Sequence, residues 1–342
     1  MKALVLGGTG FVGRRLVERL TADGAAVTVL NRGRTGVQPG DGVERLVADR
    51  SDLDSMRSVL SGREWDAVFD VSGVVQAARA ADIGDLADLL ADRVGRYVYV
   101  SSQSLYAMTG AFPWTEDSPQ VAPDVATYGG FKAATESALL SRHAERGFPV
   151  TIARPAAIYG PYNNIYDMEA AMFRRLLEHR PVLLPYGGLV VCSYGHVDDL
   201  CAALTTMATH PAAVGEIFNV TTSAITSAGY VAALADVVGE TAEIVPVPDA
   251  LAENAEAPLF SRLFTPAHHA MLDAAKITGR LGVRPTYDLR RGHAHTLEWF
   301  LRSGGAFFDR ALADPLWGRT FDLVHEADLA ARLRGAWPVR SS

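Results

Sequence analysis

The chain has 342 residues, 49% of them hydrophobic, which is enough to bury a large core together with a smaller companion. Its formal net charge of -7 and its mixed charge pattern give no basic face, so nucleic acid is not an expected partner. The sequence has only two cysteines, Cys192 and Cys201, and we recognise no secretory leader, so we expect a cytoplasmic protein without disulfides. No apolar run approaches the ~20 residues of a membrane span, so we expect no membrane anchor.

The first thirteen residues, MKALVLGGTGFVG, pass from a short apolar run into a glycine-rich turn that leads into a helical pattern. Gly7 permits a tight turn out of a strand, Gly10 lets bare backbone approach a pyrophosphate, and Gly13 lets the helix pack closely on the sheet. The unpaired N–H groups of the helix N-terminus then face the phosphates. This junction therefore predicts a dinucleotide-binding site.

Strand-like and helical segments alternate through the first half of the chain. The expected strands are Lys2 to Leu6, Ala26 to Leu30, Arg45 to Val47, Asp66 to Val71, Arg96 to Ser101 and Val150 to Ala153. Alternation at this spacing predicts an α/β fold with a doubly wound parallel sheet of the Rossmann type, and a cofactor across the carboxyl ends of the strands.

The pattern loosens after Pro155, where we expect a smaller, mixed C-terminal region that binds substrate. Helices are predicted from Val197 to Thr209, from Ser227 to Val238 and from Asp288 to Ser303, whereas Val247 to His269 has no clear period and is either a loop with a helix or a flap. The expected domains are residues 1–155 with chain returns from the second half, residues 156–305, which are mainly substrate-binding, and a C-terminal extension, 306–342.

A tyrosine and a lysine four residues apart, Tyr128 and Lys132, begin a helical stretch, and Ser102 ends a strand-like one. Residues four apart share one face of a helix, so the lysine ammonium would lower a tyrosine pKa that is ordinarily about 10. Tyr128 then becomes a general acid or base, and Ser102 can hold the substrate oxygen. The alternative is a surface pair without a catalytic role.

Together these features resemble the extended short-chain dehydrogenase/reductase branch, the NAD-dependent epimerase/dehydratase family. The resemblance is carried by GGTGFVG, Asp49, VSSQSLY, the Tyr128/Lys132 pair, ARPAAIYGP and GHVDDL. It implies that Tyr128 exchanges a proton with substrate, that Lys132 also binds the nicotinamide ribose and that Ser102, with Ser101 as the alternative, orients the substrate oxygen. It further implies that Asp49 contacts the adenine amino group and that Pro155 to Ile158 lie near the nicotinamide. The family also leaves a homodimer open.

The end of the second strand, VLNRGR, departs from the family because it lacks the acid that binds the adenosine ribose. Arg32 and Arg34 can instead bind a 2′-phosphate, so NADP is the preferred cofactor, with NAD used if these arginines form only a solvated loop. The predicted cofactor-binding residues are Gly7, Thr9, Gly10, Phe11, Val12, Gly13, Asn31, Arg32, Arg34, Asp49, Arg50, Ser72, Gly73, Tyr128, Lys132, Pro155 and Ile158.

Other departures concern the substrate. Ala157 replaces an asparagine and Cys192 an arginine that hold nucleotide sugars in the family, and Gln103 and Ser104 replace the acid pair of the dehydratases. A nucleotide-sugar substrate and water elimination are therefore not favoured. Four arginines are candidates to replace the lost guanidinium: Arg154, Arg174, Arg175 and Arg262.

The remaining polar and aromatic groups give weaker signals. The histidine pairs His268/His269 and His293/His295 lack accompanying ligands, so no metal is expected. His196 and Asp198 are expected to fix the GHVDDL turn and cap its helix. Four tyrosines either line a pocket or pack in the core: Tyr159, Tyr162, Tyr166 and Tyr186.

The sequence predicts an oxidoreductase that transfers hydride between a nicotinamide and a secondary alcohol or ketone, with Tyr128 as general acid or base. Net ketone reduction on a small polyol, sugar-like or secondary-metabolite substrate is the leading hypothesis. One alternative is a sugar or nucleotide-sugar epimerase that retains NAD(P), and another is a non-catalytic dinucleotide- or RNA-binding module.

Overall fold

The computed structural model describes residues 1–33, 38–71, 79–165, 168–253, 268–312 and 323–336. The chain forms two compact units. Unit 1 consists of Met1–Ile158, Val197–Thr221 and Leu272–Thr286, and unit 2 of Tyr159–His196, Thr222–Met271 and Tyr287–Ser342. Unit 1 thus takes back two segments from the second half of the chain.

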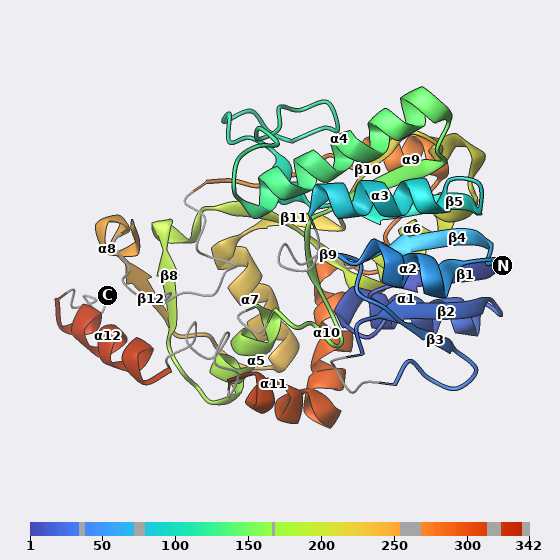
Figure 1. The fold of residues 1–342 in the computed structure, drawn as a ribbon. Coiled ribbons are helices and arrows are strands. Elements are labelled where there is room, and N and C mark those ends of the chain that lie inside the picture. Colours follow the sequence, from blue (N-terminus) through green and yellow to red (C-terminus); the bar gives the residue numbers. More distant parts are fainter. Residues whose placement is uncertain (34–37, 72–78, 166–167, 254–267, 313–322, 337–342) are drawn as a thin grey trace. The chain divides into compact units, whose positions relative to one another are not determined.

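Unit 1 is built on a seven-stranded sheet in the order β10-β6-β5-β4-β1-β2-β3, with every neighbouring pair parallel. Its strands are β1 (Lys2–Leu6), β2 (Ala26–Asn31), β3 (Glu44–Val47), β4 (Trp65–Asp70), β5 (Val94–Val100), β6 (Val150–Pro155) and β10 (Ile217–Val220). The predicted doubly wound parallel sheet is confirmed (Figure 1).

The central strands are mostly apolar and largely buried because helices cover both faces of the sheet. All six residues of β6 are buried, as are Ala3 to Leu6 of β1. The edge strand β3, with the sequence ERLV, has no fully buried residue. This difference explains why the central strands read as continuous hydrophobic runs in the sequence, whereas β3 is short and partly polar.

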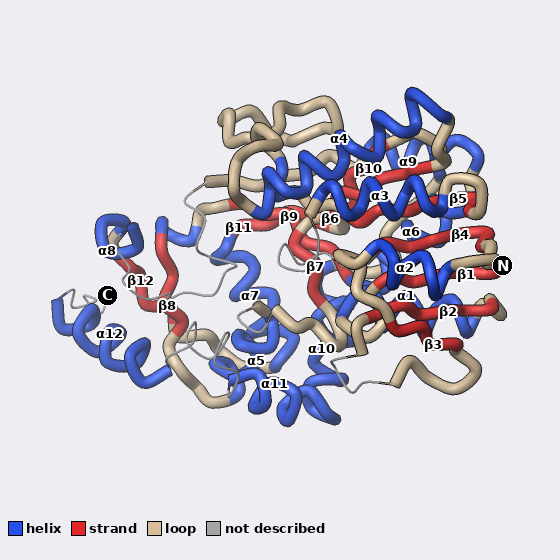
Figure 2. The backbone as a smooth tube through the Cα atoms, viewed as in Figure 1, coloured by secondary structure: helices blue, strands red, loops and turns tan. Residues whose placement is uncertain are grey.

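Two helical layers enclose the sheet (Figure 2). The helices of unit 1 are α1 (Phe11–Ala22), α2 (Leu53–Leu60), α3 (Ala80–Leu90), α4 (Tyr128–Arg146), α6 (Val197–Thr209) and α9 (Ala275–Leu281), with short 3-10 turns η1 (Gln103–Leu105) and η3 (Pro211–Ala213). Helix α3 packs between α2 and α4, whereas α1 packs against α6. The predicted helix from Val197 to Thr209 is found with the same bounds.

The strand order reverses beside β1. The chain runs from β1 through β2 to the edge strand β3, and then returns to β4 on the other side of β1. In open α/β sheets, ligands bind outside the carboxyl ends of the strands at such a reversal. Gly7, Asn31, Asp49 and Ser102 each follow within two residues of the end of a strand, or end one, so the topology brings these predicted site residues to one edge of the sheet.

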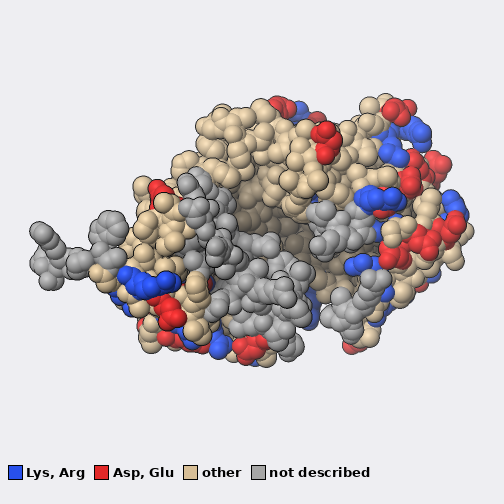
Figure 3. Space-filling model, turned by 60° about the vertical axis from the view of Figure 1, so that its left-hand side comes forward, with Lys and Arg blue, Asp and Glu red and all other residues tan. Residues whose placement is uncertain are grey.

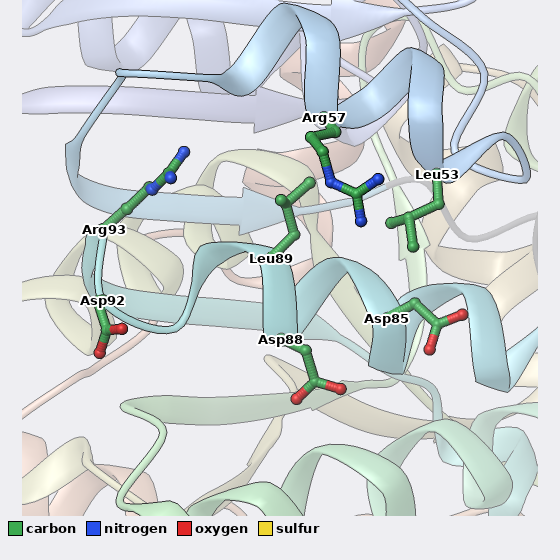
Figure 4. A pocket seen from close by; sticks show the side chains of 7 residues that line it. All are labelled: Leu53, Arg57, Asp85, Asp88, Leu89, Asp92 and Arg93. Atoms are coloured by element: carbon green, nitrogen blue, oxygen red, sulfur yellow. The ribbon is translucent and has the colours of Figure 1, made fainter.

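A hollow of about 410 Å³ lies elsewhere on unit 1, beside α2 and α3 (Figure 4). It is lined by Leu53, Arg57, Asp85, Asp88, Leu89, Asp92 and Arg93. None of the predicted site residues contributes to it. Asp88 is also ion-paired with Arg142 of α4 at 2.7 Å, so we interpret the hollow as a solvated groove between charged helices.

Unit 2 contains strands of two small sheets, one of two strands and one of three. Strand β8 (Val182–Pro185) pairs in parallel with β12 (Ile244–Val247), and β9 (Val191–His196) pairs antiparallel with β11 (Ser223–Thr226). Its helices are α5 (Glu169–Leu177), α7 (Ser227–Val238), α8 (Asp249–Glu253), α10 (Leu289–Trp299), α11 (Gly305–Leu312) and α12 (Leu323–Ala336), with the turns η2 (Tyr186–Gly188) and η4 (Phe300–Gly304). Strand β7 (Ala157–Tyr159) spans the boundary between the units.

Helix α7 packs against both α5 and α10 in unit 2. The predicted helix from Ser227 to Val238 has the same bounds in the structure, and the one expected from Asp288 to Ser303 is α10, continued by the π-helical turn η4. The unperiodic stretch from Val247 contains α8, and its residues 254–267 lie outside the described ranges.

The C-terminal helices are integrated into unit 2. Glu326 of α12 forms a buried ion pair with Arg175 of α5 at 2.5 Å, and Leu329 and Ala330 of the same helix are also buried. Phe308 of α11 is fully buried. The described helices α11 and α12 therefore contribute buried residues to the core of this unit. As elsewhere in the described chain, neither helix has the length and apolar character that crossing a membrane requires.

Candidate active site

The glycine turn after β1 has the geometry that its spacing predicts. Gly7 has a φ of 98°, in the left-handed region that favours glycine. A Cβ on Gly13 would lie 2.5 Å from the carbonyl oxygen of Gly7, so the start of α1 packs directly on the turn. A Cβ on Gly10 would meet nothing within 4 Å. Gly7 and Gly13 are thus required by the fold, whereas the bare backbone at Gly10 faces open space.

The N-terminus of α1 is suited to an anion. The helix has 12 residues, no acidic side chain in its first turn and no side-chain hydrogen bond from its N-cap, Gly10. The first N–H groups of a helix have no intrahelical acceptor, and the helix dipole places partial positive charge there. Phe11, Val12 and Gly13 supply these groups, so the turn fits the pyrophosphate of a dinucleotide.

A bidentate ion pair holds α1 against α6. Arg15 contacts both carboxylate oxygens of Asp198, at 2.8 and 2.9 Å. Asp198 lies in the first turn of α6, and its carboxylate binds this residue of another helix. Asp199 instead accepts a hydrogen bond from the Thr286 backbone at 2.8 Å. The GHVDDL motif thereby fixes the helix that presents the glycine turn.

The end of β2 carries no carboxylate in the described residues. The Asn31 side-chain oxygen accepts hydrogen bonds from the Gly33 backbone at 2.9 Å and from Arg45 at 3.2 Å. Arg32 is exposed, and Arg34 lies outside the described residues. Sequence reasoning missed Arg45, because it belongs to the next strand and only the pairing of β2 with β3 brings it here.

Two predicted cofactor residues follow β3. Asp49 accepts hydrogen bonds from the backbone and hydroxyl of Ser51, at 3.1 and 2.8 Å. Arg50 is buried and forms an ion pair with Asp70, the last residue of β4, at 2.8 Å. The other Asp70 oxygen accepts from the Tyr97 hydroxyl at 2.7 Å. The Arg50 side chain is thus held by an internal ion pair at the end of β4. Ser72 and Gly73, two further predicted cofactor residues, lie outside the described residues.

The three predicted catalytic residues come together from β5 and α4. Ser102 follows β5 and lies close enough to Tyr128, the first residue of α4, to lower the pKa of its phenol. One turn later, the ammonium of Lys132 lies 5.5 Å from the centre of the Tyr128 ring and donates a 2.8 Å hydrogen bond to the Val100 carbonyl. Tyr128 is 40% exposed, whereas Lys132 is only 1% exposed, so a substrate can reach the tyrosine from solvent.

Burial sets the protonation of this pair. It raises the pKa of Tyr128 above its ordinary value, against the opposite effect of the nearby Ser102 hydroxyl. It lowers the pKa of Lys132 to about 8, which the charge of Asp70 partly opposes. The expected lowering of the Tyr128 pKa is wrong for this structure, because the effect of burial is the larger one. At neutral pH Tyr128 is therefore a neutral phenol beside a charged lysine.

Ser101 and Gln103 are the neighbours of Ser102 in the sequence. Ser101 is buried, and its hydroxyl has no hydrogen-bond partner in the described chain. The Ser102 oxygen also accepts from the Ser104 backbone at 3.1 Å, which starts the turn η1. Because Ser102 is the serine that contacts Tyr128, the geometry favours it over Ser101 as the partner of the tyrosine.

Arg154, a candidate replacement for a substrate-binding guanidinium, has a different role. It is fully buried and contacts both carboxylate oxygens of Glu136 on α4, at 3.1 and 2.7 Å. It also donates to the Tyr106 hydroxyl at 3.0 Å and to the Glu116 carbonyl at 2.9 Å. Pro155 and Ile158, predicted near the nicotinamide, are buried next to it in β6 and β7. Arg154 thus connects β6, α4 and the segment after Ser102.

Two of the other candidate arginines, Arg174 and Arg175, have carboxylate partners within unit 2. Arg175 is paired with Glu326, and Arg174 with Glu178 and Asp309, while Arg262 lies outside the described residues. Cys192 is buried, and burial raises the pKa of its thiol to about 11, so it is unreactive.

The tyrosines and histidines of unit 2 divide between core and surface. Tyr159 is fully buried and stacks on His293 at 3.9 Å between ring centres, while Tyr162 is partly buried and Tyr166 lies outside the described residues. His293 contacts the Tyr230 hydroxyl and the Leu289 carbonyl, and burial lowers its pKa to about 3. Both are structural residues. His269 accepts a hydrogen bond from the Val191 backbone at 2.9 Å.

A sequence model of one protein family, described as the NAD dependent epimerase/dehydratase family, matches residues 3–221, more than half of the chain. The chain belongs to this family. The matched segment contains β1 to β6 and β10 of the parallel sheet, the glycine turn and the Ser102, Tyr128 and Lys132 set. The resemblance drawn from the sequence is therefore confirmed.

Two individual proteins to which this chain is similar have different names. The chain is 32% identical over 232 residues to the chloroplast stem-loop binding protein of 41 kDa b of Arabidopsis thaliana, an alignment that covers 64% of this chain and 58% of that protein. The chain thus spans little more than half of this relative. It is 28% identical over 332 residues to UDP-glucose 4-epimerase of Mycolicibacterium smegmatis, covering 88% and 98% of the two chains.

Among solved structures, the fold is similar to dTDP-glucose 4,6-dehydratase of Bacillus anthracis in complex with NAD. The TM-score is 0.74 at 20% identity, with 89% of this chain and 98% of that chain covered. At this identity the likeness concerns the fold. It extends beyond the residues of the family match and therefore includes much of unit 2.

Proposed function

We propose that this protein is an NAD(P)-dependent oxidoreductase that interconverts a secondary alcohol and a ketone, with Tyr128 as the proton-transferring residue. Net reduction of a ketone in a small polyol, sugar-like or secondary-metabolite substrate is the favoured direction. The observation that carries this proposal is the placement of Ser102 close to Tyr128 at the carboxyl end of the sheet, beside the buried ammonium of Lys132.

The residues at this edge fit a nicotinamide dinucleotide. The open backbone at Gly10 and the first turn of α1 would hold its pyrophosphate, and Lys132 its nicotinamide ribose. When bound, the nicotinamide supplies or accepts the hydride. We favour NADP over NAD, because the described residues at the end of β2 offer guanidinium groups and no carboxylate.

The protonation of the site supports reduction. Tyr128 retains its proton at neutral pH, since burial raises its pKa, and can donate this proton to the carbonyl oxygen as negative charge develops there. Ser102 orients the same oxygen through its hydroxyl. Lys132 provides positive charge that favours the tyrosinate left behind. One hydride and one proton together convert the ketone to the alcohol.

Incubation of the purified protein with NADPH and candidate ketones tests this function through absorbance of the reduced nicotinamide. We expect consumption that matches alcohol formation. Tyr128→Phe should lower kcat by about 10² to 10⁴, with a much smaller effect, less than about tenfold, on the dissociation constant for NADPH. Full activity in Tyr128→Phe would contradict the proposed role.

An epimerase that retains its cofactor is the second candidate, favoured by the similarity to UDP-glucose 4-epimerase over 88% of this chain. The same Tyr128 chemistry would then run in both directions within one turnover. The product would differ from the substrate only at one stereocentre, without net consumption of NADPH. Nicotinamide released from the purified protein by denaturation would support this candidate.

A non-catalytic RNA-binding module is the third candidate, since one relative at 32% identity is a stem-loop binding protein. The net charge of -7 opposes it. On the face drawn in Figure 3, the described Lys and Arg side chains are interspersed with Asp and Glu rather than gathered in a stripe. RNA binding that weakens steeply with salt, together with no turnover of any ketone, would favour this module over the enzyme.

A further inference from the structure

Arg45 of β3 lies at the turn that follows β2. Its guanidinium donates a 3.2 Å hydrogen bond to the Asn31 side chain. A Cβ built on Gly33 would lie 3.6 Å from a terminal nitrogen of Arg45. The charge of Arg45 is thus placed beside the backbone of the turn that carries Arg32, although 12 residues lie between Arg32 and Arg45 in the sequence.

The pairing of strands places Arg45 on the same face as the glycine turn. Arg45 lies opposite Val29 in the parallel register of β2 and β3, so their side chains share one face of the sheet. The methyl groups of Val29 lie against Gly8, where an added Cβ would approach one of them to 2.8 Å. Asn31, two residues beyond Val29, shares this face. The Arg45 side chain therefore extends along the face that carries the predicted phosphate site.

Neither Arg45 nor Arg32 has a carboxylate partner among the residues that the structure describes. Nearby arginines are paired: Arg63 lies 2.8 Å from Glu44, and Arg50 lies 2.8 Å from Asp70. The Nε atom of Arg45 is buried and lacks a hydrogen-bond partner. A partly buried cation without a counter-charge is costly, and such a group is commonly completed by an anionic ligand.

We infer that Arg45, together with Arg32, binds the phosphate on the adenosine ribose of NADP and is the residue of β3 that sets cofactor preference. This inference rests on the proposed nicotinamide-dependent function. Two guanidiniums from neighbouring strands can bind a phosphate dianion from two sides, whereas the ribose hydroxyl of NAD offers no charge. Asn31 holds Arg45 without neutralising it, which an acid at the same position would do.

Binding measurements test the inference independently of turnover. Dissociation constants for NADP, NAD, 2′,5′-ADP and 5′-ADP are measured by calorimetry for the wild type and for Arg45→Gln. The matched control is Arg63→Gln, which removes an arginine that already has a carboxylate partner. We expect Arg45→Gln to weaken NADP and 2′,5′-ADP by about ten- to hundredfold and NAD and 5′-ADP by less than about threefold. Arg63→Gln should leave all four constants unchanged.

Arg45→Lys separates charge from shape. Its ammonium keeps the charge but loses the planar donor group, so we expect an NADP preference between those of the wild type and Arg45→Gln. A wild-type NADP preference that persists in Arg45→Gln, with a native melting curve, overturns the inference even if ketone reduction is intact. Conversely, an Arg45-dependent preference in a protein that reduces no ketone supports the inference while contradicting the proposed function.

Discussion

The ammonium of Lys132 donates a 2.8 Å hydrogen bond to the carbonyl oxygen of Val100, the last residue of β5. This contact joins the first turns of α4 to the strand that leads into Ser102. Because Tyr128 begins the same helix and lies close to Ser102, the position of its phenol depends on a lysine that solvent barely reaches. Lys132 therefore acts on both the geometry and the electrostatics of the site.

The activity of the free enzyme should decrease as pH rises through about 8, the pKa to which burial lowers Lys132. Below that pH the ammonium is present and supports proton donation by Tyr128, which keeps its own proton because its pKa is raised. Asp70→Asn removes a charge that raises the Lys132 pKa, so the decline should move to lower pH. Profiles of kcat/KM against pH for both proteins measure this. An identical decline in both would assign it to another group.

Two glycine substitutions should separate folding from cofactor binding. Gly13→Ala forces a Cβ to within 2.5 Å of the Gly7 carbonyl oxygen, so we expect a loss of about 1–3 kcal/mol in unfolding free energy. Gly10→Ala meets no protein atom and should keep stability while weakening NADPH binding by about tenfold or more. Gly279→Ala, in open space on α9, is the control and should gain about 0.5–1 kcal/mol. Normal NADPH affinity in Gly10→Ala would argue against the phosphate site.

The buried pair of Arg154 and Glu136 should be a main source of stability for the site. Both side chains are almost completely buried, so Glu136→Gln leaves an uncompensated charge and should cost about 3–5 kcal/mol in urea unfolding. Asp236→Asn removes a partner of the exposed Arg290 and should cost less than about 1 kcal/mol. Equal effects of the two substitutions would show that Arg154 finds a substitute partner.

The C-terminal helix α12 should depend on one ion pair. Glu326→Gln leaves the buried charge of Arg175 without its partner, and we expect amide hydrogen exchange in Leu323–Ala336 to become faster than in the wild type. Glu298→Gln, which removes an exposed partner of Arg302, should leave that exchange unchanged. Unaltered exchange in Glu326→Gln would mean that apolar contacts of Leu329 and Ala330 hold the helix alone.

Much of this architecture was predictable because its signals are local. The strands of the central sheet are short apolar runs, and α6 and α7 have the predicted bounds because their periodicity continues between clear breaks. The proximity of the three predicted catalytic residues also has local signals, since Tyr128 and Lys132 are one helical turn apart and Ser102 follows a strand. These are properties of neighbouring residues, which the sequence displays directly.

Side-chain partners from distant segments were not predictable in the same way. Arg154 has the appearance of a candidate substrate arginine in the sequence, and only the packing of α4 on β6 shows that Glu136 neutralises it. Asp198 has the position of a helix cap, but Arg15 from α1 takes its carboxylate. Each outcome depends on which residues the fold brings within hydrogen-bonding distance.

The sequence by itself determined the glycine turn, the alternation of strands and helices and the Ser102, Tyr128 and Lys132 set, because each depends on spacing along one or two neighbouring elements. Only the tertiary structure decided which charges remain available. The pairing of β2 with β3 places Arg45 near the end of β2, without a carboxylate partner in the described chain. Arg154 and Arg175, by contrast, are buried and ion-paired with glutamates. The physical reason is that the availability of a charged side chain to a ligand depends on its neighbours in space, and these neighbours come from distant parts of the chain.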